Sequence, residues 1–450
     1  MAAASLLDGP VFLRDLSREP VVIDRAEGVY LYDEDGRAYL DAAAGAAVAS
    51  VGHGRMELAE VLREQAARVA YAHPGAFITR PTIELAEKMI ARAPEGFSRV
   101  FFTSGGSESV EAAIKLARQV HLAHGRSERV KVVSRRTSYH GATLGALAVT
   151  DQAERVAPFS ALLRIEPKIA PCYPYRCTWC HAGGRCTLEC ADDLGRVVEA
   201  EGPARIAAFI AEPIVGSSAP GAAAEPAYWR RVRAICDEHD IVFIADEVMS
   251  GNGRSGTWWA MQQAGVLPDL ITTAKGIGAG YASLGAMLVS DAMFDAFRSR
   301  RDDFRHGHTY SGHPVAAAVG SRVIDIIERE QLLVRVRQVG AYLLERLHAA
   351  FDEHPHVGDI RGRGLLAGIE FVADRASRHP FDPSLGLRAR VRQACLDRGL
   401  YIYPGGGSAG AMGGDHVLLA PPFVITHAQI DTLVDTLRAG VDAALMEIVG

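Results

Sequence analysis

Lysine is scarce in this chain: five of its 450 residues are lysine, and the last of them is Lys275. The remaining basic residues are arginines. An arginine side chain cannot form an imine with an aldehyde, whereas a lysine amine can. Covalent chemistry that needs a primary amine is therefore restricted to very few positions, and Lys275 is of interest because it directly follows an apolar run.

Two further features are missing. No run approaches the roughly 18 consecutive apolar residues of a membrane span, and Asp8 and Asp15 interrupt the N-terminus where a secretory signal needs an apolar core. We therefore expect a cytoplasmic protein without a membrane partner. The net charge of -6 provides no excess of positive charge for nucleic acid. Small molecules and copies of the chain itself are the expected partners.

The length and the composition indicate a globular protein with more than one core. The chain is 48% hydrophobic and 23% charged, which is ordinary for a folded domain, and 450 residues favour two domains. We predict an N-terminal segment of a small domain over residues 1–60, a large domain over 61–330, and a C-terminal small domain over 331–450.

The order of the predicted elements points to an α/β fold. Apolar and polar residues alternate over residues 21–41, which predicts an antiparallel hairpin. Between about residues 100 and 290 a unit of strand, polar tip and helix repeats, and this repeat is typical of a doubly wound, mostly parallel sheet. One long helical pattern covers 315–351, and the tail alternates strands and helices.

The central stretch of the chain, residues 241–280, contains two apolar runs with charged ends. The first covers 241–245 and is followed by Asp246, and the second covers 270–274 and is followed by Lys275. Both runs are typical of buried parallel strands, whose ends face the ligand crevice of an open sheet. The pair would be either a structural salt bridge or a Schiff-base lysine for pyridoxal phosphate with an aspartate at the pyridinium nitrogen.

Three other turns carry candidate binding residues. Gly105, Gly106 and Ser107 precede a helix, where they would form either a phosphate cradle or an ordinary helix cap. Tyr139 and His140 lie in a strand-to-helix turn, where the tyrosine would either stack on a cofactor ring or pack half-buried. Another apolar run ends at Glu212.

These segments resemble the class III aminotransferases, which have the fold of aspartate aminotransferase, and among them the ω-amino acid and amine transaminases. Eight motifs carry the resemblance in family order: SGGSESVEAAIKLARQ, SYHGATLGALAVT, AEPIVG, IVFIADEV, PDLITTAKGI, HTYSGHP, RGRGLLAGIEF and PPFVIT. They extend over nearly the whole chain. The resemblance implies a fold type I enzyme, with a large doubly wound sheet domain and a smaller α/β domain built from both termini.

The resemblance also implies roles for individual residues. Lys275 would be the Schiff-base lysine, Asp246 the partner of the ring nitrogen, and Thr309 a phosphate ligand contributed by a neighbouring subunit. A homodimer with shared active sites follows from that last role. The implied cofactor-binding residues are Gly105, Gly106, Ser107, Tyr139, His140, Glu212, Asp246, Val248, Lys275 and Thr309.

The expected reaction moves an amino group from an ω-amino acid or amine to a keto acid such as pyruvate, with ping-pong kinetics. One alternative keeps pyridoxal phosphate but changes the reaction to that of an aminomutase, a racemase or a decarboxylase. Another is a non-catalytic, redox-sensing protein in which the cysteines are the functional part.

The chain departs from the family in the loop before its PP motif. Many amine transaminases carry an arginine there that binds the acceptor carboxylate, whereas residues 405–416 contain none. Arg80, Arg254 and Arg363 are the candidates for that role, and Arg363 suits a structural ion pair equally well.

A cysteine-rich insert occupies residues 171–191 of the predicted large domain. Five of the seven cysteines lie there, with C-x2-C and C-x3-C spacings that favour a metal centre. The predicted ligands of an iron–sulfur cluster or a zinc ion are Cys177, Cys180, Cys186 and Cys190, with Cys172 as a further possibility. A structural staple is the expected role.

Overall fold

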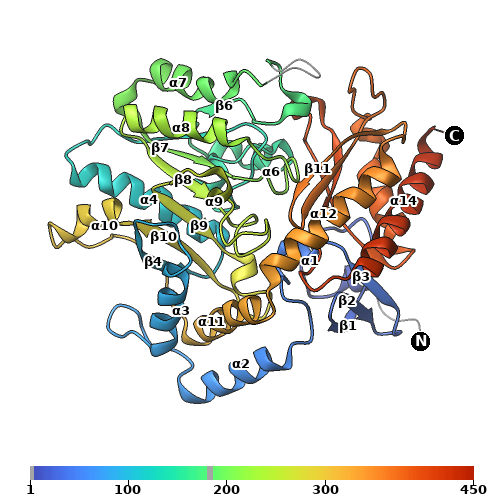
Figure 1. The fold of residues 1–450 in the computed structure, drawn as a ribbon, viewed down its shortest axis with the longest axis horizontal. Coiled ribbons are helices and arrows are strands. Elements are labelled where there is room, and N and C mark those ends of the chain that lie inside the picture. The colour runs from blue at the N-terminus through green and yellow to red at the C-terminus, as the bar shows by residue number, and fades with distance from the viewer. Residues whose placement is uncertain (1–4, 180–185, 450) are drawn as a thin grey trace.

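The computed structural model describes residues 5–179 and 186–449. It contains one seven-stranded sheet and two four-stranded sheets, which confirms the predicted α/β fold class. Figure 1 shows the large sheet and its helices on the left, and the small sheets with α12 and α14 on the right. Among the described helices, none has the length and apolar character that crossing a membrane requires.

The large sheet has the strand order β4-β10-β9-β8-β7-β5-β6. Its strands are β4 (Phe97–Thr103), β5 (Lys131–Arg135), β6 (Lys168–Ile169), β7 (Ile206–Ala211), β8 (Val242–Asp246), β9 (Leu270–Thr273) and β10 (Gly285–Ser290). Only β10 runs antiparallel to its two neighbours, β4 and β9. The other six strands therefore share one direction, and their carboxyl ends meet at one edge of the sheet.

Alternate residues of the strands face two separate cores. Val133, Phe209 and Phe243 belong to one core, which also contains residues of α3, α7, α8 and α11. Val132, Ile210 and Ile244 belong to the other, which contains residues of α4 and α10. Because both faces are covered, the strands are continuous apolar runs, as parallel strands usually are.

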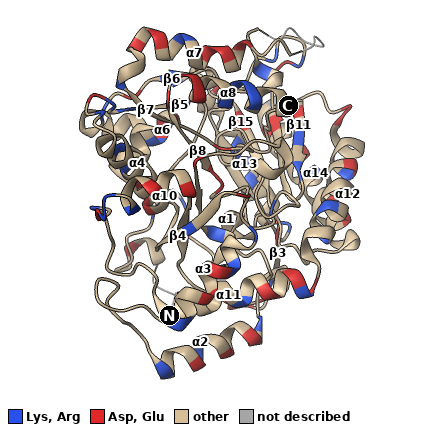
Figure 2. Ribbon diagram, turned by 60° about the vertical axis from the view of Figure 1, so that its left-hand side comes forward, with Lys and Arg blue, Asp and Glu red and all other residues tan. Residues whose placement is uncertain are grey.

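Fourteen α-helices lie in the described residues. They are α1 (Ala44–Ala47), α2 (Met56–Arg68), α3 (Arg80–Ile90), α4 (Gly106–Ala123), α5 (Leu144–Ala148), α6 (Ala153–Val156), α7 (Glu189–Glu201), α8 (Pro226–Glu238), α9 (Met261–Ala264), α10 (Asp291–Arg298), α11 (Pro314–Arg329), α12 (Leu332–Phe351), α13 (Leu387–Leu396) and α14 (His427–Val449). Figure 2 shows acidic and basic residues mixed along surface helices such as α2 and α11. The pair Arg329–Glu57, at 2.8 Å, joins these two helices.

The small sheets combine the two ends of the chain. The first has the order β1-β2-β3-β13 and the second β11-β12-β15-β14. Their strands are β1 (Ile23–Glu27), β2 (Tyr30–Asp33), β3 (Ala38–Asp41), β11 (Val357–Arg363), β12 (Leu366–Phe371), β13 (Leu400–Tyr401), β14 (Tyr403–Gly406) and β15 (Asp415–Leu419). Because β13 pairs with β3, the N-terminal hairpin and the C-terminal part share one sheet. The domain limits at residues 60 and 330 stay a prediction.

The helical pattern over 315–351 is not one helix, as the sequence predicted, but two. Between α11 and α12 the chain turns at Gln331, whose φ of 52° lies in the left-handed region. Both helices keep their apolar faces against the same core, since Ile326 and Val336 are buried there together. The helical spacing of apolar residues therefore continues across the turn, and the turn is visible only in the backbone conformation of Gln331.

Candidate active site

Residues predicted for the site lie at the carboxyl ends of five parallel strands. Lys275 follows β9, Asp246 ends β8, Glu212 follows β7, Tyr139 and His140 lie in the loop after β5, and Gly105 lies in the loop after β4. Ligands of open α/β sheets bind at this edge.

Asp246 is buried and held by several donors. Its Oδ2 lies 2.7 Å from Nδ1 of His140, and its Oδ1 accepts a hydrogen bond from the backbone N–H of Val248 at 3.0 Å. The other ring nitrogen of His140, Nε2, is buried without a hydrogen-bond partner among the described residues. His140 thus contacts the Asp246 carboxylate directly and fixes its orientation.

Lys275 has an unusual backbone and a weakened affinity for its proton. Its φ of 48° is in the left-handed region, and Asn252 supports the preceding residues because its Nδ2 donates to the carbonyl of Ala274 at 3.2 Å. Burial lowers the pKa of Lys275 to about 8, although the charges of Asp246 and Glu212 act in the opposite direction. A substantial share of the side chain is therefore a neutral amine near pH 8.

Glu212 lies beside this pair and links two loops. Its Oε2 accepts from the N–H of Gly216 at 2.7 Å, and its Oε1 accepts from the N–H of Tyr139 at 3.1 Å. Burial raises the pKa of Glu212, and neighbouring Asp246 raises it further, whereas His140 and the two backbone donors lower it. The carboxyl group positions the turn that carries Tyr139.

The N-terminus of α4 opens towards the same place. Gly105 is the extended residue before the helix, which begins at Gly106, and the first N–H groups of any helix have no acceptor within it. A side chain on Gly106 would put its Cβ 2.7 Å from Cγ1 of Val248. Ser107 Oγ accepts from the N–H of Ala142 at 3.0 Å. Glycine at 106 thus lets the helix N-terminus approach the Asp246–Val248 turn.

One residue near the site was not anticipated from the sequence. The guanidinium carbon of Arg155, in α6, lies 5.0 Å from the ring centroid of Tyr139. Its Nε donates to Oε1 of Gln152 at 2.9 Å. Arg155 belongs to a four-residue helix outside every strand-to-helix turn that we singled out, and its place after the Tyr139 turn was its only sequence signal.

Thr309 is not brought to this group of residues. It is exposed, and its carbonyl accepts a hydrogen bond from the hydroxyl of Tyr71 at 2.9 Å. Within the described residues no hydrogen bond links it to Lys275 or to Gly105. Its role at a neighbouring subunit's site stays a prediction.

The three arginines considered for the acceptor carboxylate have other surroundings. Arg254 is buried, where its Nη1 donates to the carbonyls of Leu365 and Pro421, and burial lowers its pKa to about 9. Arg363 donates to Gln263 at 3.3 Å, and Arg80 is exposed at the start of α3. The buried Nη2 of Arg254 has no hydrogen-bond partner among the described residues, and the role of these arginines in binding a carboxylate stays a prediction.

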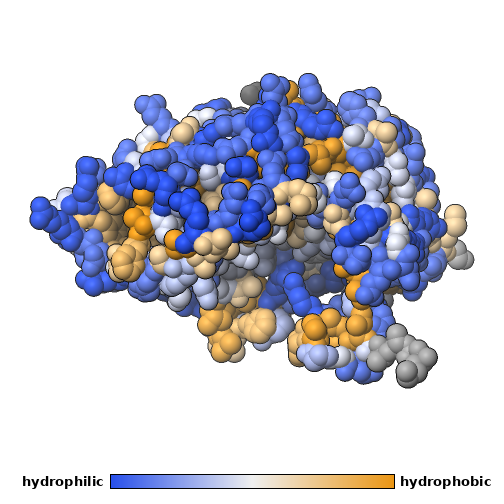
Figure 3. All heavy atoms as spheres, turned by 90° about the horizontal axis from the view of Figure 1, so that it is seen from below, coloured by the Kyte–Doolittle hydropathy of each residue, from blue (hydrophilic) through white to orange (hydrophobic). Residues whose placement is uncertain are grey.

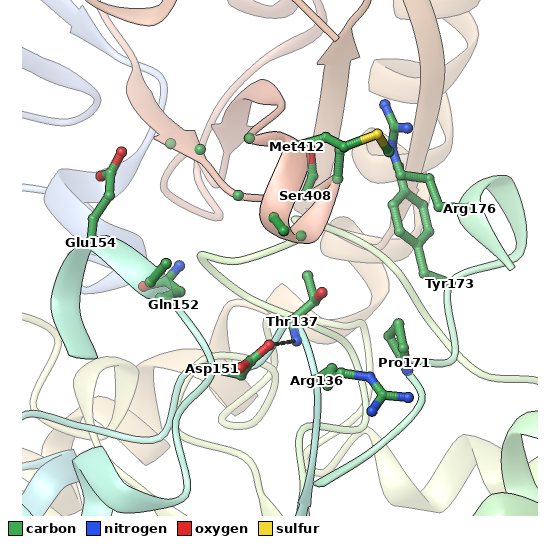
Figure 4. A pocket seen from close by; sticks show the side chains of 18 of the residues that line it. Arg136, Thr137, Asp151, Gln152, Glu154, Pro171, Tyr173, Arg176, Ser408 and Met412 are labelled. Atoms are coloured by element: carbon green, nitrogen blue, oxygen red, sulfur yellow. Dashed lines mark hydrogen bonds between the residues drawn. The ribbon is translucent and has the colours of Figure 1, made fainter. Parts of the chain in front are cut away.

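A cavity of about 1020 Å³ lies next to the loop after β5, from which Arg136 and Thr137 line it. It is lined by α6, by the start of the cysteine-rich insert and by the glycine-rich loop between β14 and β15. Figure 4 shows Gln152 and Glu154 on one side and Ser408 and Met412 of that loop above them. Below them, Thr137 N–H donates to Asp151 Oδ2 at 2.8 Å. Arg155 and Tyr403 also line the cavity, so its space adjoins Tyr139.

The predicted metal centre is not supported by the described residues. No group of three or more potential ligands converges among them. Cys186 is exposed, whereas Cys172 and Cys190 are buried, and a hydrogen bond between these two thiols raises the pKa of Cys190. Cys177 is partly buried, and Cys180 lies outside the described residues. The iron–sulfur or zinc site thus stays a prediction.

The insert does connect the large sheet to a small one. The hydroxyl of Tyr173 donates to the buried carboxylate of Glu370 in β12, and Arg176 Nε lies 2.5 Å from the same carboxylate. Arg361 also approaches it, at 3.6 Å. These contacts hold the cavity wall in place.

The comparisons with known proteins agree with this geometry. The sequence model of the family described as Aminotransferase class-III matches residues 14–441. An uncharacterized aminotransferase of Schizosaccharomyces pombe is 38% identical, over 95% of this chain and 94% of its own length. Among solved structures, a thermostable (S)-enantioselective omega-transaminase from Thermomicrobium roseum has a TM-score of 0.89 at 38% identity, covering 97% of this chain and 96% of its own.

A second solved structure was determined with a ligand. The omega-transaminase of Pseudomonas jessenii in complex with PMP has a TM-score of 0.88 at 32% identity, covering 96% of this chain and 94% of its own. The similarity in each case extends over nearly the full length of both chains.

Proposed function

The chain belongs to the class III aminotransferases, and from that premise we propose that it transfers an amino group from an amine or ω-amino acid to a keto acid such as pyruvate. Its membership in an enzyme family argues against the non-catalytic, redox-sensing alternative. The observation that carries the proposal is the pair formed by Lys275 and the His140-bound Asp246 at adjoining strand ends.

The residues fit pyridoxal phosphate, the cofactor expected for this family. The N-terminus of α4, with Gly105, Gly106 and Ser107, offers backbone N–H groups for the phosphate. Asp246 would accept the hydrogen bond of the ring nitrogen, and Lys275 supplies the amine. Tyr139 and Val248 would lie against the two faces of the ring. A Cβ at position 106 would clash with Val248, so only glycine fits between the start of α4 and this side chain.

When bound, the cofactor withdraws electrons from the substrate carbon that loses its proton. Asp246 keeps a proton on the ring nitrogen because its negative charge favours the protonated form, and His140 keeps that carboxylate in place. Lys275 Nζ would act as the base that takes the proton from the substrate carbon and as the acid that gives it back. A pKa near 8 suits this exchange, since both protonation states of the amine are then accessible.

A homodimer with shared sites belongs to the same proposal. Phe77, Ile78 and Tyr310 are 66%, 70% and 60% exposed, and Tyr71 joins their segments because its ring lies 5.9 Å from that of Tyr310. Figure 3, viewed from the side of α2, shows hydrophobic side chains gathered at several places on this face. An apolar surface of this kind favours a second copy as its occupant, and it includes exposed Thr309. A cytoplasmic location stays a prediction.

The test is product analysis with defined substrates. Purified protein, loaded with pyridoxal phosphate, is given 1-phenylethylamine and pyruvate, and alanine and acetophenone are quantified. We expect equal amounts of both products and parallel double-reciprocal lines, because the ketone leaves before pyruvate binds. Lys275→Ala should abolish turnover while its circular dichroism spectrum stays unchanged.

Other products would point to the alternative reactions. Racemised, isomerised or decarboxylated substrate in the absence of an acceptor would favour a racemase, an aminomutase or a decarboxylase. Intersecting kinetic lines would contradict the ping-pong order.

A further inference from the structure

The cavity next to Arg155 and Tyr403 is rich in arginine, but most of these arginines already have partners. Six arginines line it: Arg136, Arg155, Arg176, Arg378, Arg388 and Arg392. Four of them form ion pairs, namely Arg136 with Asp193, Arg176 with Glu370, Arg388 with Glu154 and Arg392 with Asp15. Within the described residues, Arg155 and Arg378 have no carboxylate at ion-pair distance.

Of these two, only Arg155 is close to the reacting residues. Its guanidinium lies against the ring of Tyr139. Its positive charge contributes, after burial and after the charge of Arg254, to the lowered pKa of Lys275. Arg378 instead contacts the ring of Tyr175 at 4.9 Å and donates to the carbonyl of that residue. Of the two cavity arginines without a carboxylate partner, Arg155 is therefore the one that lies next to Tyr139.

The side chain of Arg155 is already oriented. Gln152 holds its Nε, and the Tyr139 ring supports the guanidinium plane through a cation–π contact. The two Nη groups have no hydrogen-bond partner among the described residues, so they remain available. A carboxylate accepts two parallel hydrogen bonds from such a group.

The opposite wall leaves room for a ligand. Strand β14 and the loop that follows it contribute residues 405–413 to the cavity lining, and all of them except Met412 are glycine, serine or alanine. No arginine from this loop competes for the same carboxylate. A cation on α6 would therefore act in place of one on the loop.

We propose that Arg155 binds the carboxylate of the keto-acid acceptor and so selects acidic over neutral acceptors. This inference rests on the proposed amino transfer. It assigns a specificity-determining role to a residue of α6, and it explains how a site without an arginine in residues 405–416 could still recognise an acid.

The experiment compares acceptors with and without the charge. Steady-state kinetics with 1-phenylethylamine as donor are measured with pyruvate and with butanal, a neutral acceptor, for wild type, Arg155→Met and Arg155→Lys. We expect Arg155→Met to raise KM for pyruvate by about 10- to 100-fold, because a charge-assisted, two-point contact is lost. KM for butanal should stay unchanged, and Arg155→Lys should recover part of the loss.

A binding measurement without turnover accompanies the kinetics. Oxamate, an unreactive carboxylate shaped like pyruvate, is titrated calorimetrically into the loaded enzyme. Arg155→Met should weaken oxamate binding by the same factor as it raises KM for pyruvate. Arg378→Met is the matched control, since it removes the other cavity arginine that has no carboxylate partner, and it should leave both values unchanged.

The outcomes separate this inference from the proposed function. Three results would overturn the role of Arg155. They are an equal increase in KM for pyruvate and butanal in Arg155→Met, no increase in KM for pyruvate, or the same increase in Arg378→Met. If wild type transfers no amino group from 1-phenylethylamine to either pyruvate or butanal, the proposed function fails. Oxamate binding still decides whether Arg155 holds a carboxylate.

Discussion

Lys275 keeps a left-handed backbone, with a φ of 48°, that costs a residue with a side chain about 1–2 kcal/mol. Such conformations persist where the surrounding structure fixes them, and they are concentrated at functional sites. Here Asn252 holds the end of β9, because its Nδ2 donates to Thr273 Oγ1 at 2.7 Å. The interactions of Asn252 thus offset the backbone cost at Lys275.

The lowered pKa of Lys275 predicts how the protein without cofactor responds to pH. Only the neutral amine reacts with an aldehyde, so the rate of pyridoxal phosphate uptake, followed by absorbance, should rise with pH and level off above about 8. The unfolded chain binds this proton more tightly, with a pKa near 10.5, so stability should also rise between about 8 and 10.5.

A matched variant makes the assignment to Lys275 specific. Lys275→Ala should show neither the absorbance change nor the increase in stability over that pH window. If uptake in the wild type had its midpoint near pH 10.5, burial would not lower the pKa of Lys275.

The contact between Gly106 and Val248 predicts a rescue. Gly106→Ala would bring a Cβ to 2.7 Å from Val248 Cγ1, and overpacking of this kind costs about 1–3 kcal/mol. We expect about tenfold weaker binding of pyridoxal phosphate to the apoprotein, measured by titration. Val248→Ala removes the clashing atom. In the Val248→Ala background, Gly106→Ala should therefore not weaken pyridoxal phosphate binding any further. Additive losses in the double variant would argue against the clash.

At the scale of elements, the large sheet was predictable but its connections were less so. Uniform apolar runs such as 241–245 identify β8 and β9 because both faces of a parallel sheet are buried. The break between α11 and α12 was missed because the turn at Gln331 contains neither glycine nor proline, which would have signalled it. The apolar spacing also continues past the turn. The short helix α6 has too few residues for any periodicity.

The attachment of the cysteine-rich insert to β12 predicts a large stability effect. The side chain of Glu370 is buried and lies between Arg176 and Arg361. Glu370→Gln would leave buried guanidinium groups with less compensation, which costs about 3–5 kcal/mol. We expect a loss of about 3 kcal/mol in the free energy of unfolding, measured in urea.

An exposed ion pair supplies the comparison. Glu447→Gln breaks the pair with Arg390 at 2.6 Å, which is exposed to solvent, and such pairs contribute little. This variant should leave the unfolding midpoint unchanged. Equal effects of the two substitutions would mean that the insert is not anchored through Glu370.

For the whole molecule, the exposed apolar surface around Ile78 predicts association. Ile78→Asp would place a charge on the surface that the proposed dimer buries, and a buried carboxylate without a partner is costly. We expect the variant to sediment as a monomer and to lose activity, because Thr309 would no longer reach the neighbouring site. Met446→Asp, on the exposed face of α14, should leave the dimer intact. A monomeric wild type would contradict the proposal.

The site itself could be predicted only in part. Residues that follow apolar strands, such as Asp246 and Lys275, were identified because the topology of a parallel sheet brings their positions together. Arg155 was not, because it meets Tyr139 through a loop and a short helix whose path depends on tertiary packing. The role of Thr309 depends on a second subunit, so a single chain cannot test it.

The five strand ends around Lys275 also determine when the pocket exists during folding. They come from segments far apart in the chain, so their contacts form only after most of the large sheet has assembled, as expected for non-local contacts. A ligand that requires all five ends binds the native state and not the unfolded chain. Pyridoxal phosphate should therefore slow unfolding and leave the refolding rate nearly unchanged, which makes the holoprotein kinetically more persistent than the apoprotein.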